Sequence, residues 1–296
     1  MPLWKGVRFA AVALGAVAAA LGARCADRYP LLSALPGPCA PCVCSDVGVL
    51  KGCPYHAELR ESILWISGRG VTAVAEGALE GNEGASLVYL HENALETLPA
   101  GVFDGLRNPM AIRLDRNKIA ELPPGLFDGL GPLQVLYMGH NRLEELPPGL
   151  FDALGGLRAL DLRSNRLRHL PSETFRGLQH ISAIDVSANN ISHPIGAGTF
   201  ALPDLAFVSL AHNPIQSMEA GAFGGSLEHA WLTGSNLTCA GLARAGGLPP
   251  SGAGCTDEGV CGAVFAVAPI GNGVCDERAD PQYNTAECLW DGGDCD

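Results

Sequence analysis

Apolar and polar residues follow one pattern that returns every 24 residues through the middle of the chain. An asparagine marks each return, with apolar residues five and three positions before it and two positions after it. Around Asn117 these are Ile112, Leu114 and Ile119. Apolar residues two apart face the same side of a short strand. The pattern therefore predicts one short strand per copy in a stack of similar coils. The marking residues are Asn93, Asn117, Asn141, Asn165, Asn189 and Asn213.

The copies resemble the leucine-rich repeat, whose pattern is L-x-x-L-x-L-x-x-N-x-L. Their sequences are LVYLHENAL, AIRLDRNKI, QVLYMGHNRL, RALDLRSNRL, SAIDVSANNI and AFVSLAHNPI. The likeness to Slit, Toll-like receptors and lamprey variable lymphocyte receptors covers residues 39–255. It implies an α/β leucine-rich-repeat solenoid, a horseshoe with a parallel concave sheet, and extracellular protein recognition.

Two weaker copies flank the six. Arg69 replaces the asparagine in the first, and Ser235 replaces it in the last, where the period shortens to 22. Terminal copies of a solenoid differ because they cover the core without a neighbour. We therefore expect eight strands, with repeats over residues 60–226 and a last repeat with its cap over 227–255.

Two kinds of side chain are expected to fill the stack. An asparagine amide donates and accepts at once, so the stacked asparagines should satisfy backbone groups in the turns. A phenylalanine ten residues after each of the first four asparagines should fill the convex side of the core. These residues are Phe103, Phe127, Phe151 and Phe175.

The amino terminus is typical of a secretory signal peptide, since Lys5 and Arg8 precede an apolar run over residues 9–23. The run is shorter than the roughly 20 residues that span a bilayer, although an uncleaved signal anchor is an alternative. We expect cleavage after Ala23 or Cys25, and no transmembrane span in the mature chain. The expected segments are a signal peptide over 1–25 and a linker over 26–38.

The composition agrees with a folded, secreted protein. Hydrophobic residues make up 47% of the 296 residues and charged residues 17%, which suits a packed solenoid. The net charge of −12 disfavours nucleic acid as a partner, because phosphates need a basic surface. The same charge suits a protein that holds a cation.

The eleven cysteines lie at the two ends of the repeats. If Cys25 leaves with the signal peptide, ten remain, and an even number indicates structural disulfides in an oxidising compartment. If Cys25 stays, its unpaired thiol could link two chains.

The spacing C-x2-C-x-C-x8-C from Cys39 to Cys53 resembles the amino-terminal cap of extracellular leucine-rich-repeat proteins, which we expect over residues 39–59. Zinc is the alternative for such a cluster, but secretion and position argue for disulfides. Two further cysteines resemble a reduced carboxyl-terminal cap. The resemblance implies the pairs Cys39–Cys44, Cys42–Cys53 and Cys239–Cys255.

Residues 256–296 resemble a Notch-type cysteine-rich repeat through the motifs G-N-x-x-C and C-x-W-D-G-G-D-C. The family has six cysteines, and here the second and fourth are missing, the fourth near Ala279. The resemblance implies the pairs Cys261–Cys288 and Cys275–Cys295. So small a module needs such staples because it buries little apolar surface.

The resemblance also implies that this module binds calcium, which prefers six to eight oxygen ligands. Gly292 and Gly293 let the turn bring two aspartates onto one ion. An ordinary acidic turn is the alternative. The predicted ligands are Asn272, the Val274 carbonyl, Asp276, Asp291 and Asp294.

Side chains four, two and one positions before each asparagine are expected to point out of the concave sheet. Aromatic residues and arginine, which are enriched where proteins dock, gather in the first four strands. Tyr89, Arg113 and Tyr137 would form one hot spot, whereas His229 and Trp231 would belong to the carboxyl-terminal cap. A solvated surface with scattered rings is the alternative. The candidate ligand-binding residues are Trp65, Tyr89, His91, Arg113, Arg116, Tyr137 and His140.

The chain is not expected to be an enzyme. Asp161 and Asp185 take the same position in adjacent strands, roughly 5 Å apart, as do the carboxylates of retaining glycosidases. Arg163 nearby indicates a charge pair instead, and no nucleophile or phosphate-loop motif occurs. The histidines expected on the sheet lie too far apart to share a metal, and these are His91, His140 and His212.

Asn190 and Asn236 begin acceptor sequons for glycosylation. Together these features predict a secreted, non-enzymatic protein that binds calcium and recognises a protein or glycan through its concave face. The alternative is a structural component of an extracellular matrix or cell wall without one selective ligand.

Overall fold

The computed structural model describes residues 43–44, 48–52 and 63–237. The predicted signal peptide, the predicted calcium-binding module and every predicted disulfide cysteine except Cys44 lie outside these residues. Asn190 and Asn236 lie within them, and both are exposed.

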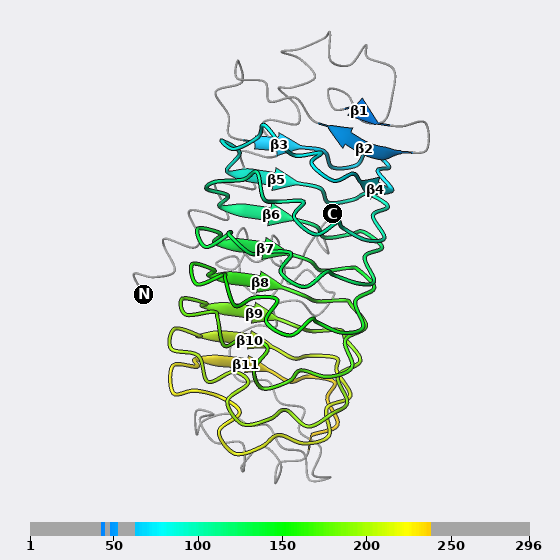
Figure 1. Cartoon of the computed structure of the whole chain (residues 1–296). Helices are drawn as coiled ribbons and strands as arrows, with labels where there is room; N and C mark the ends of the chain where they lie inside the picture. The colour runs from blue at the N-terminus through cyan, green and yellow to red at the C-terminus, as the bar shows by residue number, and fades with distance from the viewer. Residues whose placement is uncertain (1–42, 45–47, 53–62, 238–296) are drawn as a thin grey trace, which may run out of the picture. The chain divides into compact units, whose positions relative to one another are not determined.

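Eight short parallel strands form one sheet and follow one another in chain order (Figure 1). Each strand residue pairs with the residue 24 positions earlier in the preceding strand, as Ile112 pairs with Val88. Between the last two strands the offset is 22, as Ala230 pairs with Val208. The predicted count of eight strands is confirmed. The strands are β3 (Ile63–Trp65), β5 (Leu87–Tyr89), β6 (Ala111–Arg113), β7 (Val135–Tyr137), β8 (Ala159–Asp161), β9 (Ala183–Asp185), β10 (Phe207–Ser209) and β11 (His229–Trp231).

A second sheet of three strands accompanies the first coil. Strand β1 (Val43–Cys44) pairs antiparallel with β2 (Val49–Gly52), and β2 pairs parallel with β4 (Ala73–Val74). The Ala75 amide also donates to the Leu50 carbonyl at 2.7 Å, and the Leu50 side chain is fully buried. An amino-terminal capping segment was predicted from the sequence, but this second sheet was not.

The repeated asparagines bind backbone groups of two neighbouring coils, as predicted. The Asn141 Nδ2 donates to the carbonyls of Leu114 at 3.0 Å and Met138 at 3.1 Å. Its Oδ1 accepts from the Ile119 amide at 3.0 Å. The first coil, which has Arg69 in the asparagine position, is joined by the same means, because Asn93 Oδ1 accepts from the Arg69 amide at 3.0 Å.

The residue before each asparagine adopts a left-handed backbone conformation. In the six central coils φ lies between 51° and 56°, in residues that include Arg116 and His140. Glycine, which takes this conformation without a steric penalty, fills the position in the terminal coils as Gly68 and Gly234. This conformation turns the chain away from the strand direction, so each strand ends before it.

Phenylalanine rings stack along the side of the coils opposite the sheet. The ring centroids of Phe103, Phe127, Phe151 and Phe175 follow one another at 6.0, 6.4 and 6.1 Å, and all four side chains are buried. This prediction is confirmed. The stack also continues beyond the prediction, through Phe200 at 5.5 Å and Phe223 at a further 5.8 Å.

Candidate ligand-binding surface

The outer sheet face comprises the side chains four and two positions before each asparagine, on the side of the sheet away from the apolar core. The position four before the asparagine is the last residue of each strand, for example Tyr89 in β5 and Arg113 in β6. Alternation along a strand directs it opposite to its buried neighbours. In agreement, Tyr89 and Trp231 are buried but do not belong to the apolar core cluster.

Three predicted binding residues form one aromatic cluster at the β3–β5 end of this face. The Trp65 and Tyr89 ring centroids lie 5.1 Å apart, and His91 lies 6.1 Å from Trp65 and 5.7 Å from Tyr89. All three contacts are edge-to-face, an arrangement that aromatic quadrupoles favour. We call Trp65, Tyr89 and His91 the aromatic cluster.

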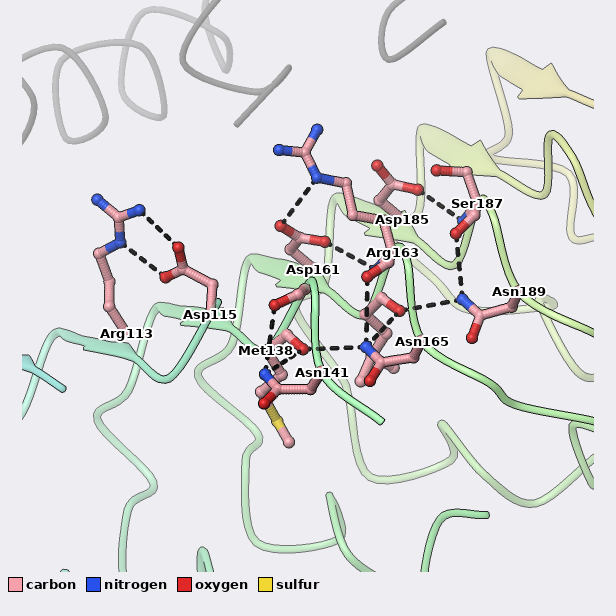
Figure 2. A network of polar contacts seen from close by, with 12 residues as sticks. Arg113, Asp115, Met138, Asn141, Asp161, Arg163, Asn165, Asp185, Ser187 and Asn189 are labelled. Carbon is pink, nitrogen blue, oxygen red and sulfur yellow. Dashed lines mark hydrogen bonds and ion pairs between the residues drawn. The ribbon is translucent and has the colours of Figure 1, made fainter. Parts of the chain in front are cut away.

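Arg113 and Tyr137 continue the surface on β6 and β7. The Arg113 guanidinium carbon lies 5.3 Å from the Tyr137 ring centroid, within the range of a cation–π contact. Asp115 holds the guanidinium through two hydrogen bonds of 2.9 and 2.8 Å (Figure 2). Asp115 was not among the predicted binding residues. It lies two residues after Arg113, so its side chain is expected on the same side of the sheet.

Exposure separates these residues into two groups. Trp65, Arg113 and Tyr137 are partly exposed, and the Arg113 side chain retains 34% of its surface. Tyr89 and His91 are only 4% and 9% exposed. Truncation of Tyr89 should therefore affect folding as well as binding, because removing a buried ring leaves a cavity.

His91, Tyr89 and Tyr137 are uncharged near neutral pH, and burial shifts the pKa of each further toward the neutral form. Burial lowers the pKa of His91 to about 4, with a smaller contribution from the Arg113 charge. Burial also raises the pKa of Tyr137 to about 12 and raises that of Tyr89. The aromatic cluster and Tyr137 thus offer neutral rings, and Arg113 supplies the cation.

Two predicted binding residues occupy a different place. Arg116 and His140 lie in the turns after β6 and β7, at the left-handed position with φ of 55° and 53°. They were expected to point out of the sheet with the others. The structure places them beyond the strand ends, where Arg116 is exposed and His140 is partly exposed.

An acidic pair occupies the outer sheet face at its centre. Asp161 of β8 and Asp185 of β9 are register partners, and both are buried. Arg163 contacts the Asp161 carboxylate at 3.6 Å through Nε and donates its backbone amide to the same carboxylate at 2.9 Å (Figure 2). The Ser187 amide donates to Asp185 at 2.8 Å. The predicted charge pair with Arg163 is confirmed.

Burial perturbs the titration of both carboxylates. Burial raises the pKa of Asp161 to about 7, and the neighbouring charge of Asp185 raises it further. Burial likewise raises the pKa of Asp185. One arginine lies between two acids, so this part of the face is acidic, in contrast to the aromatic cluster.

A second group of rings lies at the β10–β11 end. Phe207 lies 5.2 Å from His229 and 6.2 Å from Trp231, with the rings inclined by 25° and 21°. His229 and Trp231 were assigned to the carboxyl-terminal cap, and Phe207 was not singled out. Phe207 stands six positions before its asparagine, where the preceding copies carry Ile, Leu, Val or Ala, so a search of only the positions four, two and one before the asparagine could not find it.

Within the described residues, no group of three or more His, Cys, Asp or Glu side chains could hold a metal ion. Nor do the described residues contain a helix long and apolar enough to cross a membrane.

Comparison with known proteins identifies the repeats. Residues 110–167 and 155–215 match the leucine rich repeat family model, and no curated protein matches the chain. TLR13, solved in complex with ssRNA13, superposes with a TM-score of 0.56 and 22% identity, over 63% of this chain and 27% of that one. Drosophila Toll, solved with Spatzle, gives 0.50 and 23%, over 58% of this chain and 26% of that one.

The chain thus covers about a quarter of the length of either structure. At these identities the likeness concerns the fold. Residues 110–215 are leucine-rich repeats, and they belong to a parallel-sheet solenoid of the kind found in TLR13 and Toll.

Proposed function

We propose that this chain is a secreted, non-enzymatic binding protein that recognises another protein through the outer sheet face of β3–β7. The proposal rests on one observation. The aromatic cluster and the Arg113–Tyr137 pair lie next to each other on four neighbouring strands. Tryptophan, tyrosine and arginine are the residue types that dominate binding energy in protein interfaces.

The contact residues of the proposed site are those with exposed surface, Trp65, Arg113 and Tyr137. Tyr89 packs edge-on against Trp65 and supports it from within the face. Asp115 fixes the Arg113 guanidinium before a ligand arrives, which reduces the entropy lost on binding. Arg116 and His140 would contact the ligand only where it extends over the turns.

Charge supports a protein ligand rather than a nucleic acid. The chain has a net charge of −12, and the acidic pair Asp161–Asp185 lies beside the proposed site. The TLR13 structure contains RNA and the Toll structure contains Spatzle, so the fold itself is compatible with either class. A test must therefore include single-stranded RNA as a second probe.

The same proposal includes further features that only sequence motifs support. These are export, disulfide-linked caps, a calcium site at the carboxyl terminus and sugars on Asn190 and Asn236. The exposure of both asparagines is compatible with glycosylation. Calorimetric titration of the full chain with calcium should give a heat that Asp291→Asn and Asp294→Asn both abolish. Equal heats in all three proteins would refute the calcium site.

The ligand proposal is tested by probing an array of secreted proteins and cell-surface ectodomains with the full chain, followed by affinity measurement on the strongest hit. Trp65→Ala, Arg113→Ala and Tyr137→Ala should each weaken binding by about 1 kcal/mol or more, which is roughly fivefold. Thr233→Ala, at the far end of the same face, is the matched control and should leave the affinity unchanged.

Thermal unfolding of each variant separates lost binding from lost folding, and Tyr137→Phe provides a variant that keeps the ring. Small and equal losses in all variants would contradict a localised site. Saturable binding of single-stranded RNA, lost in the same variants, would replace the protein ligand with a nucleic acid.

A further inference from the structure

Two histidines stand side by side on adjacent coils, away from the outer sheet face. His169 and His193 each follow their asparagine by four residues, and their ring centroids are 5.8 Å apart with an interplanar angle of 64°. We propose that His169 and His193 together bind one divalent transition-metal ion, with zinc as the representative case. Imidazole is a preferred ligand of zinc, copper and nickel.

The separation of the rings fits a shared ion. Zinc–nitrogen bonds of about 2.0–2.1 Å at a tetrahedral angle place the centroids of two imidazole rings roughly 5 Å apart. The observed 5.8 Å is close to that separation. His193 is exposed and His169 is partly exposed, so small side-chain rotations can close the remaining gap.

A backbone hydrogen bond also fixes the chemical form of one ligand. His193 Nδ1 lies 3.2 Å from the Arg168 carbonyl oxygen. A carbonyl only accepts, so Nδ1 carries the proton and the Nε2 of the neutral ring keeps its lone pair. Metal-binding histidines commonly have this second-shell bond, because it holds the ring and sets the tautomer.

The backbone holds the two segments in register. The Asn190 amide donates to the Leu167 carbonyl at 2.9 Å, and the Ser192 amide donates to the Arg168 carbonyl at 3.2 Å. The charge of Arg168 is offset by Glu144, 2.6 Å from its guanidinium. The ion would thus link two coils whose spacing is already set, and little ordering would be required.

The described residues offer no third acidic, thiol or histidine ligand to complete a group of three. Water would therefore occupy the other coordination positions, as in sites that remain open to a further ligand. Binding should weaken at acidic pH, because protons compete for the imidazole nitrogens. The site is independent of the proposed ligand-binding surface.

The test is zinc titration of the full chain by calorimetry, with His169→Gln, His193→Gln and the control His180→Gln. His180 is an exposed histidine whose Nδ1 lies 3.1 Å from Asp204, so it tests for unspecific histidine binding. Zinc binding elsewhere in the chain contributes equally to all four proteins. Either variant of the pair should weaken one binding event by roughly tenfold or more, and the control should retain it.

Copper(II) electron paramagnetic resonance provides a second readout that does not depend on affinity. The spectrum should show two imidazole nitrogens on one ion in the unaltered chain, and one in either variant of the pair. Four identical titrations, equal losses in the control, or a spectrum with a single nitrogen in the unaltered chain would each overturn the shared site.

Discussion

Adjacent positions of the same strands differ sharply in how much they vary between coils. Five residues before each asparagine, the six central coils carry only Val, Ile or Leu, and none is more than 1% exposed. One residue later, the side chain changes from Tyr89 and Arg113 to Asp161, Asp185 and Ser209. The inward side chain must pack against the equivalent apolar side chains of the two neighbouring coils, whereas the outward side chain meets no such requirement.

The outward positions are also divided along the solenoid. The β3–β7 end carries neutral aromatic rings and Arg113, which is bound by Asp115. Strands β8 and β9 carry two carboxylates with raised pKa values, and Arg163 lies beside them. The repetition of the core makes the solenoid, and the variation of its outer face makes one end chemically different from the other. Substitutions at the two kinds of position should therefore separate stability from recognition.

The largest effect is expected from the phenylalanine stack. Phe151 is fully buried between Phe127 and Phe175, so Phe151→Ala leaves a cavity and should reduce the free energy of unfolding by about 3–5 kcal/mol. Urea denaturation measures the loss. The matched control is Phe207→Ala, because Phe207 is partly exposed among rings of the outer face. Equal losses of unfolding free energy in the two variants would contradict the distinction between core and outer face.

A smaller effect is expected in the asparagine ladder. Asn165→Ala removes hydrogen bonds to the Met138 carbonyl and from the Leu143 amide, both in buried surroundings. Buried groups left unpaired should lower the free energy of unfolding by about 2–3 kcal/mol. Asn190→Ala, an exposed asparagine in the next coil, should change it by less than about 0.5 kcal/mol in unglycosylated protein. An Asn165 variant as stable as the control would show that the ladder is dispensable.

Much of the fold could be predicted because the stack repeats one solution. The 24-residue period alone predicts where each strand lies. It also predicts that Ile112 is buried and that the Asn117 side-chain amide is hydrogen-bonded, without knowledge of any distant contact. The terminal sheet of β1, β2 and β4 breaks the repetition. Its strand pairings depend on contacts between segments that do not repeat, so the 24-residue period does not predict them.

The outer face was predictable as a surface but not as a set of contacts. Strand alternation was sufficient to bring Trp65, Tyr89 and Arg113 to one face. It could not show that Tyr89 is buried and Trp65 partly exposed, since exposure depends on how neighbouring side chains pack. The left-handed backbone of Arg116 was also not predicted, because it occurs in a residue other than glycine.

The acidic pair should give the outer face a pH dependence of its own. The pKa of Asp161 is raised to about 7, so between pH 4 and pH 7 the folded state binds more protons than the unfolded state. Stability from this group is present at low pH and is lost progressively as the pH rises from about 4 toward 7. Asp161→Asn should remove this dependence, as measured by urea denaturation at each pH.

The readout for the acidic pair is the difference in stability between the unaltered chain and the variant, because other groups titrate in both. That difference should fall between pH 4 and pH 7. Asp128→Asn removes an exposed aspartate and is the control for the change in net charge. A difference for Asp161→Asn that does not change with pH would show that the pKa of Asp161 is not raised in the folded state.

The smallest effect is expected at the exposed ion pair between coils formed by Arg176 and Asp152. The pair is well formed, with a closest distance of 2.7 Å, and the hydrogen bond from Arg176 lowers the pKa of Asp152. Both side chains are nevertheless largely in water, where exposed ion pairs contribute little to stability and are screened by salt. Arg176→Ala should therefore lower the melting temperature only slightly, and the loss should shrink in high salt. Arg166→Ala, another exposed arginine, is the control for the change in net charge. A loss at Arg176 as large as that at Phe151 would mean that contacts on the coil exterior, and not only the inner stack, hold neighbouring coils together.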